Sequence, residues 1–501
     1  MITNHNQIAV ISSHGTLTYG DLDGHASRLA RLLLDRGFRS GDGVALALSN
    51  RPEYAEVLWA CERAGFWFIP INQSLSASEM AHILKDSEAK AFITEAKLKS
   101  AVESIPEEFP GIDCFSIGPL PGFEDYHRRL KLEDAEPFVS LKGGGVMRYT
   151  SGTTGYPKGV RKPPNNPETE KVRYQRQPSP MVEGESVVLV NGPLYHAAPL
   201  KFDLAVPLKK RATIVMTDKW DAENTLRLIE HHKVTHMHMV PTMFERLLSL
   251  PEDKRVCYDL SSLRQILHGA APISINTKRA MIDWLGPIFF EYYGGSEGGG
   301  TDITTEEWLK KPGSVGKPWV HRVVEILDDQ GSVLPPHTVG HVYFRTPEEG
   351  AFHYHNDPEK TQDAYKDGRF TIGDQGYLDA DGYLFLTGRT SEVIIAGGVN
   401  IYPAEIDSVL IQHKAVADVA TVGIPHPVYG EEVKAVVELK DLEADEALLR
   451  EELLAYCREH LAKFKCPRSI DFVESIPRSA AGKIMRQEVR KPYWSESSQQ
   501  I

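Results

Sequence analysis

The sequence has few cysteines, and nothing in their spacing suggests a shared role. Its 501 residues contain five of them, odd in number and without Cys-x-x-Cys spacing: Cys61, Cys114, Cys257, Cys457 and Cys466. Disulfide frameworks and cysteine metal clusters are therefore not expected, and a reducing cytosol is the simplest setting.

Long apolar runs are also absent. The most apolar early stretch, residues 57–71, is interrupted by Glu62, Arg63 and Pro70 and is too short to span a bilayer. The first ten residues contain no basic region followed by an apolar run, so we expect no secretory signal. The sequence therefore predicts a cytoplasmic protein without a transmembrane segment.

Positive charge is in deficit. The chain has 56 lysines and arginines against 69 aspartates and glutamates, which gives a formal charge of -13. This balance disfavours nucleic acid or an anionic membrane as the main partner, so any anionic ligand must be held by a local site. A chain of this length with 41% apolar and 25% charged residues is typical of a globular protein with two or more domains.

Short apolar runs alternate with helical patterns in the first part of the chain. The spacing of apolar residues predicts helices over residues 19–37, 53–64 and 76–86, with strands over 44–48, 66–71 and 91–94. Ser76 and Glu79 form a predicted capping box at the start of the third helix. The same rhythm returns between residues 187 and 240. Such alternation is typical of parallel sheets covered by helices, an α/β architecture.

The pattern changes after residue 388. Shorter units follow, with helices predicted over residues 403–413 and 446–461 and strands over 416–422 and 433–439. We therefore divide the chain into a large domain at residues 1–388, a hinge at 389–392 and a small α+β domain at 393–501.

A loop at residues 149–160, Tyr-Thr-Ser-Gly-Thr-Thr-Gly-Tyr-Pro-Lys-Gly-Val, is the strongest local signal. Its glycines let the backbone approach a ligand, its hydroxyls and N–H groups can donate to phosphate oxygens, and its lysine adds positive charge. It is not a Walker A loop, and a plain surface turn is the alternative. The residues expected to bind a polyphosphate are Thr150, Ser151, Gly152, Thr153, Thr154, Gly155 and Lys158.

This loop resembles the signature loop of the adenylate-forming superfamily, which includes acyl-CoA synthetases, luciferases and the adenylation domains of peptide synthetases. Further similar segments follow in family order across nearly the whole chain. The resemblance implies a large N-terminal domain of parallel sheets covered by helices, with a β-barrel-like part, and a small mobile C-terminal lid. Segments around residues 235–243 and 306–316 are similar to those of bacterial ligases for long-chain fatty, bile-acid and other bulky acids.

Four segments carry the nucleotide site that the resemblance implies. The segment 293–297 resembles the family's Tyr-Gly-x-Thr-Glu element, in which the aromatic ring stacks on adenine and the glutamate helps to hold Mg²⁺. An acidic residue after Gly373 is expected to accept hydrogen bonds from the ribose hydroxyls. The implied ATP- and AMP-binding residues are Gly269, Ala270, Ala271, Tyr293, Gly294, Ser296, Asp374 and Arg389, with Glu297 as the metal ligand.

Three further segments are similar to those that carry the family's chemistry. Lys483, in the segment 477–483, is implied to bridge the acyl carboxylate and the α-phosphate and to stabilise the charge of the transition state. His196 is implied to lie beside the acyl carboxylate, and a packed structural histidine is the alternative. Gly397 and Gly398 resemble the glycines that line the tunnel for the thiol arm of coenzyme A, with a simple hairpin turn as the alternative. The catalytic set is thus Lys483, His196 and Glu297.

Together these segments predict an AMP-forming acid–thiol ligase. A small-molecule carboxylic acid reacts with ATP and Mg²⁺ to give an acyl-adenylate, and the acyl group then passes to coenzyme A. A medium-chain, long-chain or bulky polycyclic hydrophobic acid is favoured. An enzyme that loads the phosphopantetheine of a carrier protein, an oxidative enzyme of luciferase type and a non-catalytic nucleotide-binding protein are the alternatives. The oligomeric state is left open, with a homo-oligomer among the options.

Overall fold

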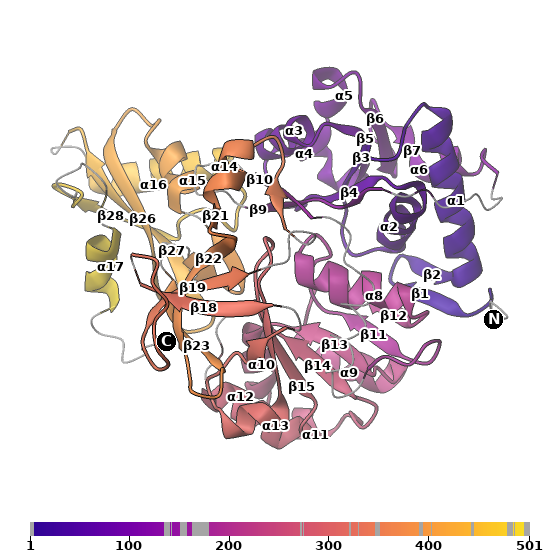
Figure 1. Ribbon diagram of the computed structural model, residues 1–501. Helices are drawn as coiled ribbons and strands as arrows, with labels where there is room; N and C mark the ends of the chain where they lie inside the picture. The colour runs from indigo at the N-terminus through magenta and orange to yellow at the C-terminus, as the bar shows by residue number, and fades with distance from the viewer. Residues whose placement is uncertain are drawn as a thin grey trace.

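The computed structural model describes residues 5–134, 141, 143–150, 158–162, 180–270, 273, 275–319, 322–328, 330–345, 351–389, 394–401, 403–441, 445–477, 484 and 486–494. Two helix-covered sheets form the indigo-to-pink part of the chain, and smaller sheets from the later part lie beside them (Figure 1). Among the described residues, no helix combines the length and the low polarity that crossing a bilayer requires.

The first sheet has six strands in the order β7-β6-β5-β3-β4-β8, and all its pairings are parallel. Helices connect successive strands, which confirms the predicted α/β alternation. The strands are β3 (Gly43–Ala47), β4 (Trp67–Pro70), β5 (Ala89–Glu95), β6 (Asp113–Ile117), β7 (Glu124–Asp125) and β8 (Gly145–Val146). The helices around them are α1 (Tyr19–Asp35), α2 (Pro52–Ala64), α3 (Ala77–Asp86), η1 (Ala96–Leu98), α4 (Lys99–Val102), α5 (Ile105–Glu108) and α6 (Tyr126–Leu130).

The predicted capping box starts helix α3. The hydroxyl of Ser76 accepts from the backbone N–H of Glu79, and the carboxylate of Glu79 accepts from the backbone N–H of Ser76. Two N–H groups that the helix leaves without a carbonyl partner are satisfied in this way. Helix α1 ends just before Gly37, whose positive φ of 90° suits the chain reversal that follows.

The second sheet has nine strands in the order β17-β16-β15-β14-β13-β11-β12-β1-β2. Its centre, from β15 to β1, is parallel, and both edges add antiparallel strands. The strands are β1 (Ile8–Ser12), β2 (Gly15–Thr18), β11 (Val187–Val190), β12 (Thr213–Met216), β13 (His236–Met239), β14 (Gln265–His268), β15 (Phe289–Tyr293), β16 (Thr301–Thr304) and β17 (Lys317–Pro318). The helices are the π-helix η2 (Pro199–Ala205), α8 (Val206–Lys209), α9 (Ala222–His232), α10 (Pro241–Leu248), α11 (Glu252–Val256), α12 (Ile275–Leu285) and α13 (Thr305–Lys310).

Two antiparallel sheets follow. One joins β9 (Arg148–Thr150), β10 (Lys158–Arg161) and β20 (His353–Tyr354). The other contains β18 (Val323–Leu327), β19 (Gly340–Arg345), β21 (Tyr365–Lys366), β22 (Arg369–Leu378) and β23 (Leu384–Arg389), and helix α14 (Pro358–Asp363) precedes β21. These pairings give a five-stranded antiparallel sheet and leave the predicted barrel-like form a prediction.

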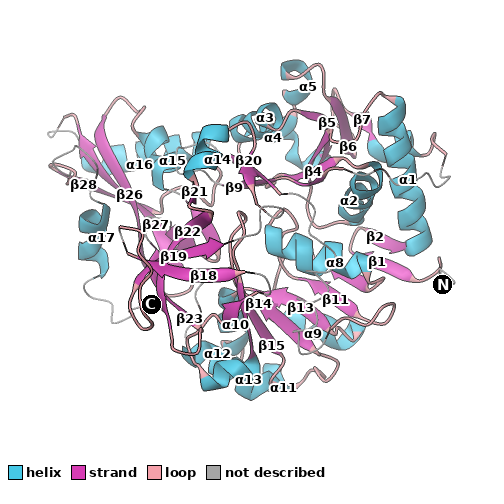
Figure 2. Cartoon of the chain, in the orientation of Figure 1, coloured by secondary structure: helices cyan, strands magenta, loops and turns pink. Residues whose placement is uncertain are grey.

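The last part of the chain forms a separate sheet with three helices, as Figure 2 shows at its left side. The predicted elements after residue 400 are confirmed, whereas the domain and hinge boundaries stay a prediction because residues 390–393 lie outside the described residues. The strands are β24 (Ile394–Ala396), β25 (Val399–Ile401), β26 (Val416–His426), β27 (Gly430–Leu439) and β28 (Ser469–Val473), and the helices are α15 (Pro403–Leu410), α16 (Glu446–His460) and α17 (Arg486–Trp494).

A buried ion cluster links this last part to the first sheet. The ammonium group of Lys465 contacts Oε1 of Glu79, at the start of α3, and Oε1 of Glu405, in α15, the latter at 2.6 Å. All three residues are buried, and Ala462 nearby packs into the apolar cluster of the first sheet. The small C-terminal part is therefore held against the body of the protein by charge as well as by apolar contact.

Candidate functional site

The predicted phosphate loop is the connection between two paired strands. Thr150, at the end of β9, lies opposite Lys158, at the start of β10, in an antiparallel pair. Residues 151–157 of the loop, which include Ser151, Gly152, Thr153, Thr154 and Gly155, lie outside the described residues. The ammonium group of Lys158 is partly buried and lies 3.9 Å from the carboxylate of Asp357. The strand pair thus fixes both ends of the loop and turns its lysine toward the segment that carries Asp357.

Two residues predicted to hold the nucleoside contact each other. The hydroxyl of Tyr293, the last residue of β15, donates to Oδ2 of Asp374 in β22 over 2.6 Å. Asp374 is buried, with 4% of its surface exposed, and it pairs in register with Arg389 of β23. The ring of Tyr293 also packs on Phe344, with 5.9 Å between centroids. The structure therefore brings Tyr293, Asp374 and the backbone of Arg389 together at one place.

A glycine-rich turn follows Tyr293 and holds Glu297. The N–H of Gly295 donates to the carbonyl of Gly298 over 2.9 Å, so that Ser296 and Glu297 form the tip of a tight turn. Gly298 has a φ of 136°, a conformation that side chains with a Cβ rarely adopt. Oε1 of Glu297 accepts a hydrogen bond of 3.4 Å from the hydroxyl of Tyr354 in β20. The turn therefore presents a carboxylate beside the strand that pairs with β10.

Cationic side chains gather around Lys162, which interacts with Glu297. The pKa of Lys162 is lowered to about 7, first by burial and then by the charge of Arg148, while the carboxylate of Glu297 opposes both effects. Lys201 and Arg322 act on Lys162 in the same direction as Arg148. In a protein with a formal charge of -13, this concentration of positive charge near one carboxylate fits an anionic ligand.

A second lysine near the phosphate loop also has a perturbed pKa. Burial lowers the pKa of Lys360 to about 8, and the neighbouring ammonium group of Lys158 adds to this effect. The charges of Asp357 and Glu297 act in the opposite direction. An anion bound between Lys158 and Lys360 would relieve the repulsion between them.

The oxygen ligands available at Glu297 fit a magnesium ion that is already bound to a nucleotide. Among the described residues, no group of three or more histidines, cysteines or acidic residues is placed to hold a metal ion. Mg²⁺ commonly uses only one or two protein carboxylates and takes its other ligands from phosphates and water. The hard oxygens of Glu297 therefore suit Mg²⁺ that arrives with a nucleotide.

The segment before His196 is clamped by a residue of the first sheet. Oδ1 of Asn50 accepts from the N–H of Leu194, and Nδ2 of Asn50 donates to the carbonyl of Gly192, both over 3.0 Å. Burial lowers the pKa of His196 to about 4, so its imidazole is neutral near pH 7. The position of His196 is thus set by a contact between two sheets.

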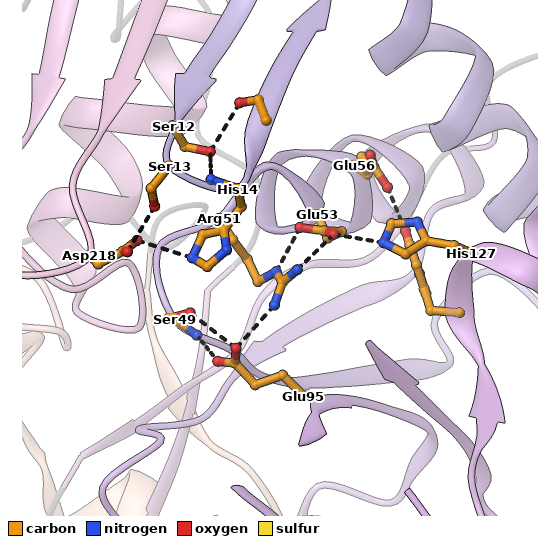
Figure 3. A network of polar contacts seen from close by, with 12 residues as sticks. Ser12, Ser13, His14, Ser49, Arg51, Glu53, Glu56, Glu95, His127 and Asp218 are labelled. Atoms are coloured by element: carbon orange, nitrogen blue, oxygen red, sulfur yellow. Dashed lines mark hydrogen bonds and ion pairs between the residues drawn. The ribbon is translucent and has the colours of Figure 1, made fainter. Parts of the chain in front are cut away.

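The loop that carries Asn50 is itself anchored by the polar network in Figure 3. Arg51 pairs with the carboxylate of Glu53 at 2.7 Å and with that of Glu95 at 3.1 Å. The backbone N–H of Ser49 donates to Oε1 of Glu95 over 2.6 Å. These buried, charge-assisted contacts fix the loop at the carboxyl ends of β3 and β5.

Gly269 lies directly against the strand that carries Tyr293. A Cβ at Gly269 would stand 2.5 Å from the carbonyl oxygen of Tyr292, a distance that forces the backbone to move. Ala270 has a φ of 69°, a strained conformation for a residue with a Cβ. Ala271 lies outside the described residues. The close approach of β14 and β15 explains the glycine that the sequence places here.

Gly397 and Gly398 form the turn between β24 and β25, and both have positive φ values, 60° and 80°. A Cβ at Gly398 would lie 3.7 Å from Cβ of Val240, the residue that precedes helix α10. The turn of the C-terminal part therefore rests on the body of the protein near the end of β13. Lys483 lies outside the described residues, so its place in the site stays a prediction.

The sequence patterns missed three residues that shape the site. Tyr354 and Lys360 lie in a segment without a recognisable motif, and they reach the site because β20 pairs with β10. Asn50 lies more than 140 positions from the segment that it clamps. A polar residue directly after a buried strand was the only signal for it. Lys162, a fourth residue outside the predicted site, is partly buried beside the turn of Glu297.

Comparison with known proteins identifies the family of this chain. Residues 3–352 match the family model described as AMP-binding enzyme, and residues 405–483 match the AMP-binding enzyme C-terminal domain. The chain belongs to the AMP-binding enzyme family. The first match contains Tyr293 and Glu297, and the second match ends at Lys483.

Other members of the AMP-binding enzyme family align with nearly the whole chain. Feruloyl-CoA synthase from Amycolatopsis sp is 33% identical over 492 residues, which cover 96% of this chain and 95% of that protein. Long-chain-fatty-acid–CoA ligase FadD13 from Mycobacterium tuberculosis is 31% identical over 495 residues, 95% of this chain and 93% of that protein. The structure of the amide bond synthetase McbA from Marinactinospora thermotolerans superposes with a TM-score of 0.84 at 27% identity and covers 97% of each chain.

Proposed function

We propose that this protein is an AMP-forming acid–thiol ligase that converts a carboxylic acid, ATP and coenzyme A into an acyl-CoA, AMP and diphosphate. The hydrogen bond between Tyr293 and Asp374, beside Glu297 and the cations near it, is the observation that carries the proposal. This arrangement supports the proposal, because an aromatic face suits a purine, a carboxylate accepts from ribose hydroxyls, and nearby positive charge suits a triphosphate.

In the first half-reaction the acid attacks the α-phosphate of ATP. Tyr293 and Asp374 hold the nucleoside, while Lys158 and the hydroxyl loop hold the phosphates. Glu297 would hold Mg²⁺, which supplies positive charge to the leaving diphosphate. His196 lies neutral beside the acid, so it can orient the carboxylate by donating one hydrogen bond. Lys483 is the residue that would bridge the two reacting anions.

In the second half-reaction the thiol of coenzyme A displaces AMP. The contact between Gly398 and Val240 supports the proposed thiol tunnel, because two glycines without side chains leave space next to the carboxyl end of β13. The second candidate acceptors are a carrier-protein phosphopantetheine and an amine. The latter is prompted by the likeness to an amide bond synthetase.

The identity of the carboxylic acid does not follow from the type of reaction. Relatives of similar identity are named for an aromatic acid and for long-chain fatty acids. We propose that the substrate is a hydrophobic acid of medium size or larger. The full chain activates this acid in the cytoplasm and acts on small-molecule substrates alone.

The test is a panel of aromatic, bile-type and C6 to C18 acids incubated with ATP and Mg²⁺, with and without coenzyme A. The proposal predicts AMP and diphosphate in equal amounts, with turnover that depends on coenzyme A. Formation of ADP and phosphate would refute the AMP-forming reaction. Sustained turnover with an amine or a pantetheinylated carrier, but not with coenzyme A, would refute the proposed acceptor.

A further inference from the structure

A small, partly open cavity of about 60 Å³ lies between helix η2 and strands β13 and β14, with the exposed residues Pro180 and Lys210 in its lining. Its wall is mostly apolar, with Phe202 and Val206 on the helical side and Met237 and Leu267 on the sheet side. The polar lining residues are Asp203, His236 and Lys210. None of these side chains has a part in the proposed chemistry.

The cavity adjoins the proposed acyl site. Leu267 lies two residues before Gly269, and Phe202 belongs to the helix that follows His196. The ring of Phe202 packs on Tyr292, the neighbour of Tyr293, with 5.1 Å between centroids. Because β13 and β14 are parallel and their carboxyl ends face the site, the cavity lies deeper, toward the amino ends of these strands. An acyl group that starts at His196 and runs along η2 would reach it.

Asp203 is the unusual member of the wall. Only 1% of its surface is exposed, and Oδ1 accepts a hydrogen bond of 3.0 Å from the backbone N–H of His238. Its other oxygen, Oδ2, has no hydrogen-bond partner in the described part of the chain. A buried polar atom without a partner costs free energy, and such atoms gather where a ligand supplies the missing partner.

The protonation state of Asp203 defines that partner. Burial raises the pKa of its carboxyl group well above the ordinary value, and only the N–H of His238 opposes this effect. Burial therefore favours the protonated carboxyl group, which has a hydroxyl group to donate. A hydroxyl, methoxy or keto oxygen accepts such a bond, whereas a hydrocarbon does not.

We propose that this cavity receives the distal end of the acyl group, and that Asp203 selects acids that carry an oxygen substituent there. This inference rests on the proposed function and adds a specificity-determining residue to it. Asp203 follows His196 by seven positions, most of them in the π-helix η2, so about two helical turns lie between the two residues. The cavity has room for about four water-sized groups, so it takes the tip of the acyl group and not the whole of it.

The test compares pairs of acids that differ only in the distal oxygen, such as 4-hydroxycinnamic with cinnamic acid and 10-hydroxydecanoic with decanoic acid. Diphosphate release gives kcat/KM for each acid. We expect the wild-type protein to favour the oxygenated member of a pair at least about tenfold, because the plain member leaves Asp203 unpaired. A ratio near one for every pair would overturn the inference.

Two variants assign the preference to Asp203. Asp203→Leu should bring the ratio close to one without lowering kcat/KM for the plain acid. Asp203→Asn keeps an acceptor for the N–H of His238 and offers a new N–H donor, so it should keep the preference. A preference that survives in Asp203→Leu would overturn the inference.

A third variant tests the cavity itself, should Asp203→Leu fail to fold. Val206→Phe reduces the volume of the cavity and keeps the carboxyl group of Asp203, so it should raise KM for the longer oxygenated acid at least about tenfold and leave KM for ATP unchanged. An unchanged KM for the acid would overturn the inference. Absence of diphosphate release with every acid would instead refute the proposed function, which separates the two failures.

Discussion

The hydroxyl of Tyr293 donates a hydrogen bond of 2.6 Å to Asp374, although the two residues are 81 positions apart. The bond joins the end of the parallel strand β15 to β22 of an antiparallel sheet, so residues from two sheets act as one unit. Asp374 in turn lies opposite Arg389, the first residue of the predicted hinge. The proposed nucleoside contacts are therefore connected to the start of the predicted hinge through β22 and β23.

Replacing Asp374 by asparagine should lower kcat/KM for ATP by about 10- to 100-fold, because hydrogen bonds to a charged group contribute about 1.5–3 kcal/mol. Tyr293→Phe is the matched control. It removes the hydroxyl that orients Asp374 and keeps the aromatic face, so its effect should be smaller. Exchange of labelled diphosphate into ATP measures both. Equal exchange in wild type and Asp374→Asn would exclude a nucleoside contact by this carboxylate.

His196 should make the folded protein less stable at acidic pH. Its folded pKa, about 4, lies below the ordinary value of 6.5, so the unfolded chain binds a proton that the folded chain does not between these two values. Stability is therefore lost as the pH falls from 6.5 toward 4. The wild-type protein should lose up to about 3 kcal/mol more than His196→Asn across this range.

Chemical unfolding at pH 6.5 and pH 4.5 measures the difference between the two proteins. The same neutrality predicts that the adenylation rate has no inflection from this residue between pH 6 and 8. Parallel losses of stability in both proteins would place the imidazole in water and contradict its buried, neutral state.

Glu297→Gln should raise the magnesium concentration needed for half-maximal adenylation by about tenfold, because the amide is a weaker ligand for Mg²⁺ than the carboxylate. Tyr354→Phe is a control that removes a hydrogen bond to Glu297 and leaves its charge. A magnesium titration of diphosphate exchange gives the shift. An unchanged magnesium requirement in Glu297→Gln would show that the metal is held elsewhere.

The buried cluster of Glu79, Lys465 and Glu405 should make the protein less stable at alkaline pH. Burial raises the pKa of Glu405 to about 7, and the charge of Lys465 limits the rise. Because this pKa lies above the ordinary 4.5, the folded state keeps a proton that the unfolded chain has lost, so stability falls as pH rises from 4.5 through 7. Above pH 7 the cluster contains two carboxylates for one ammonium group.

Melting temperatures at pH 5.5 and pH 8 measure this dependence. Glu405→Gln stays neutral, so its melting temperature should fall less than that of the wild-type protein. Lys465→Met leaves both carboxylates buried without a cation and should cost about 3–5 kcal/mol at pH 8. A pH dependence that is identical in wild type and Glu405→Gln would contradict the raised pKa of Glu405.

Local signals in the sequence account for most of the regular structure. The helix of residues 76–86 and its capping box follow from neighbours three and four positions apart, and these interactions are the same in any fold. The alternation of helices and buried strands likewise predicts parallel sheets. The order of strands in a sheet does not follow from local signals. Strand β1 pairs with β12, about 200 residues later, and no local pattern specifies that pairing.

The residues of the candidate site show the same difference between local motifs and long-range contacts. Glycines and hydroxyls near Thr150 and the segment around Tyr293 are visible as motifs because close backbone approach restricts the residue type. Asn50 and Tyr354 act through single side-chain contacts across the fold, which leave no local pattern. The cavity at Asp203 could not be predicted for a further reason, since an aspartate outside any motif is expected to be solvated until its burial is known.

The acyl-adenylate route is the central claim, and the fate of the carboxylate oxygen tests it most directly. The best acid from the panel is labelled with ¹⁸O in its carboxylate and turned over with ATP and coenzyme A, and the products are weighed by mass spectrometry. Attack of the carboxylate on the α-phosphate predicts one ¹⁸O atom in each AMP and none in diphosphate. Unlabelled AMP, or label in phosphate or diphosphate, would contradict the account.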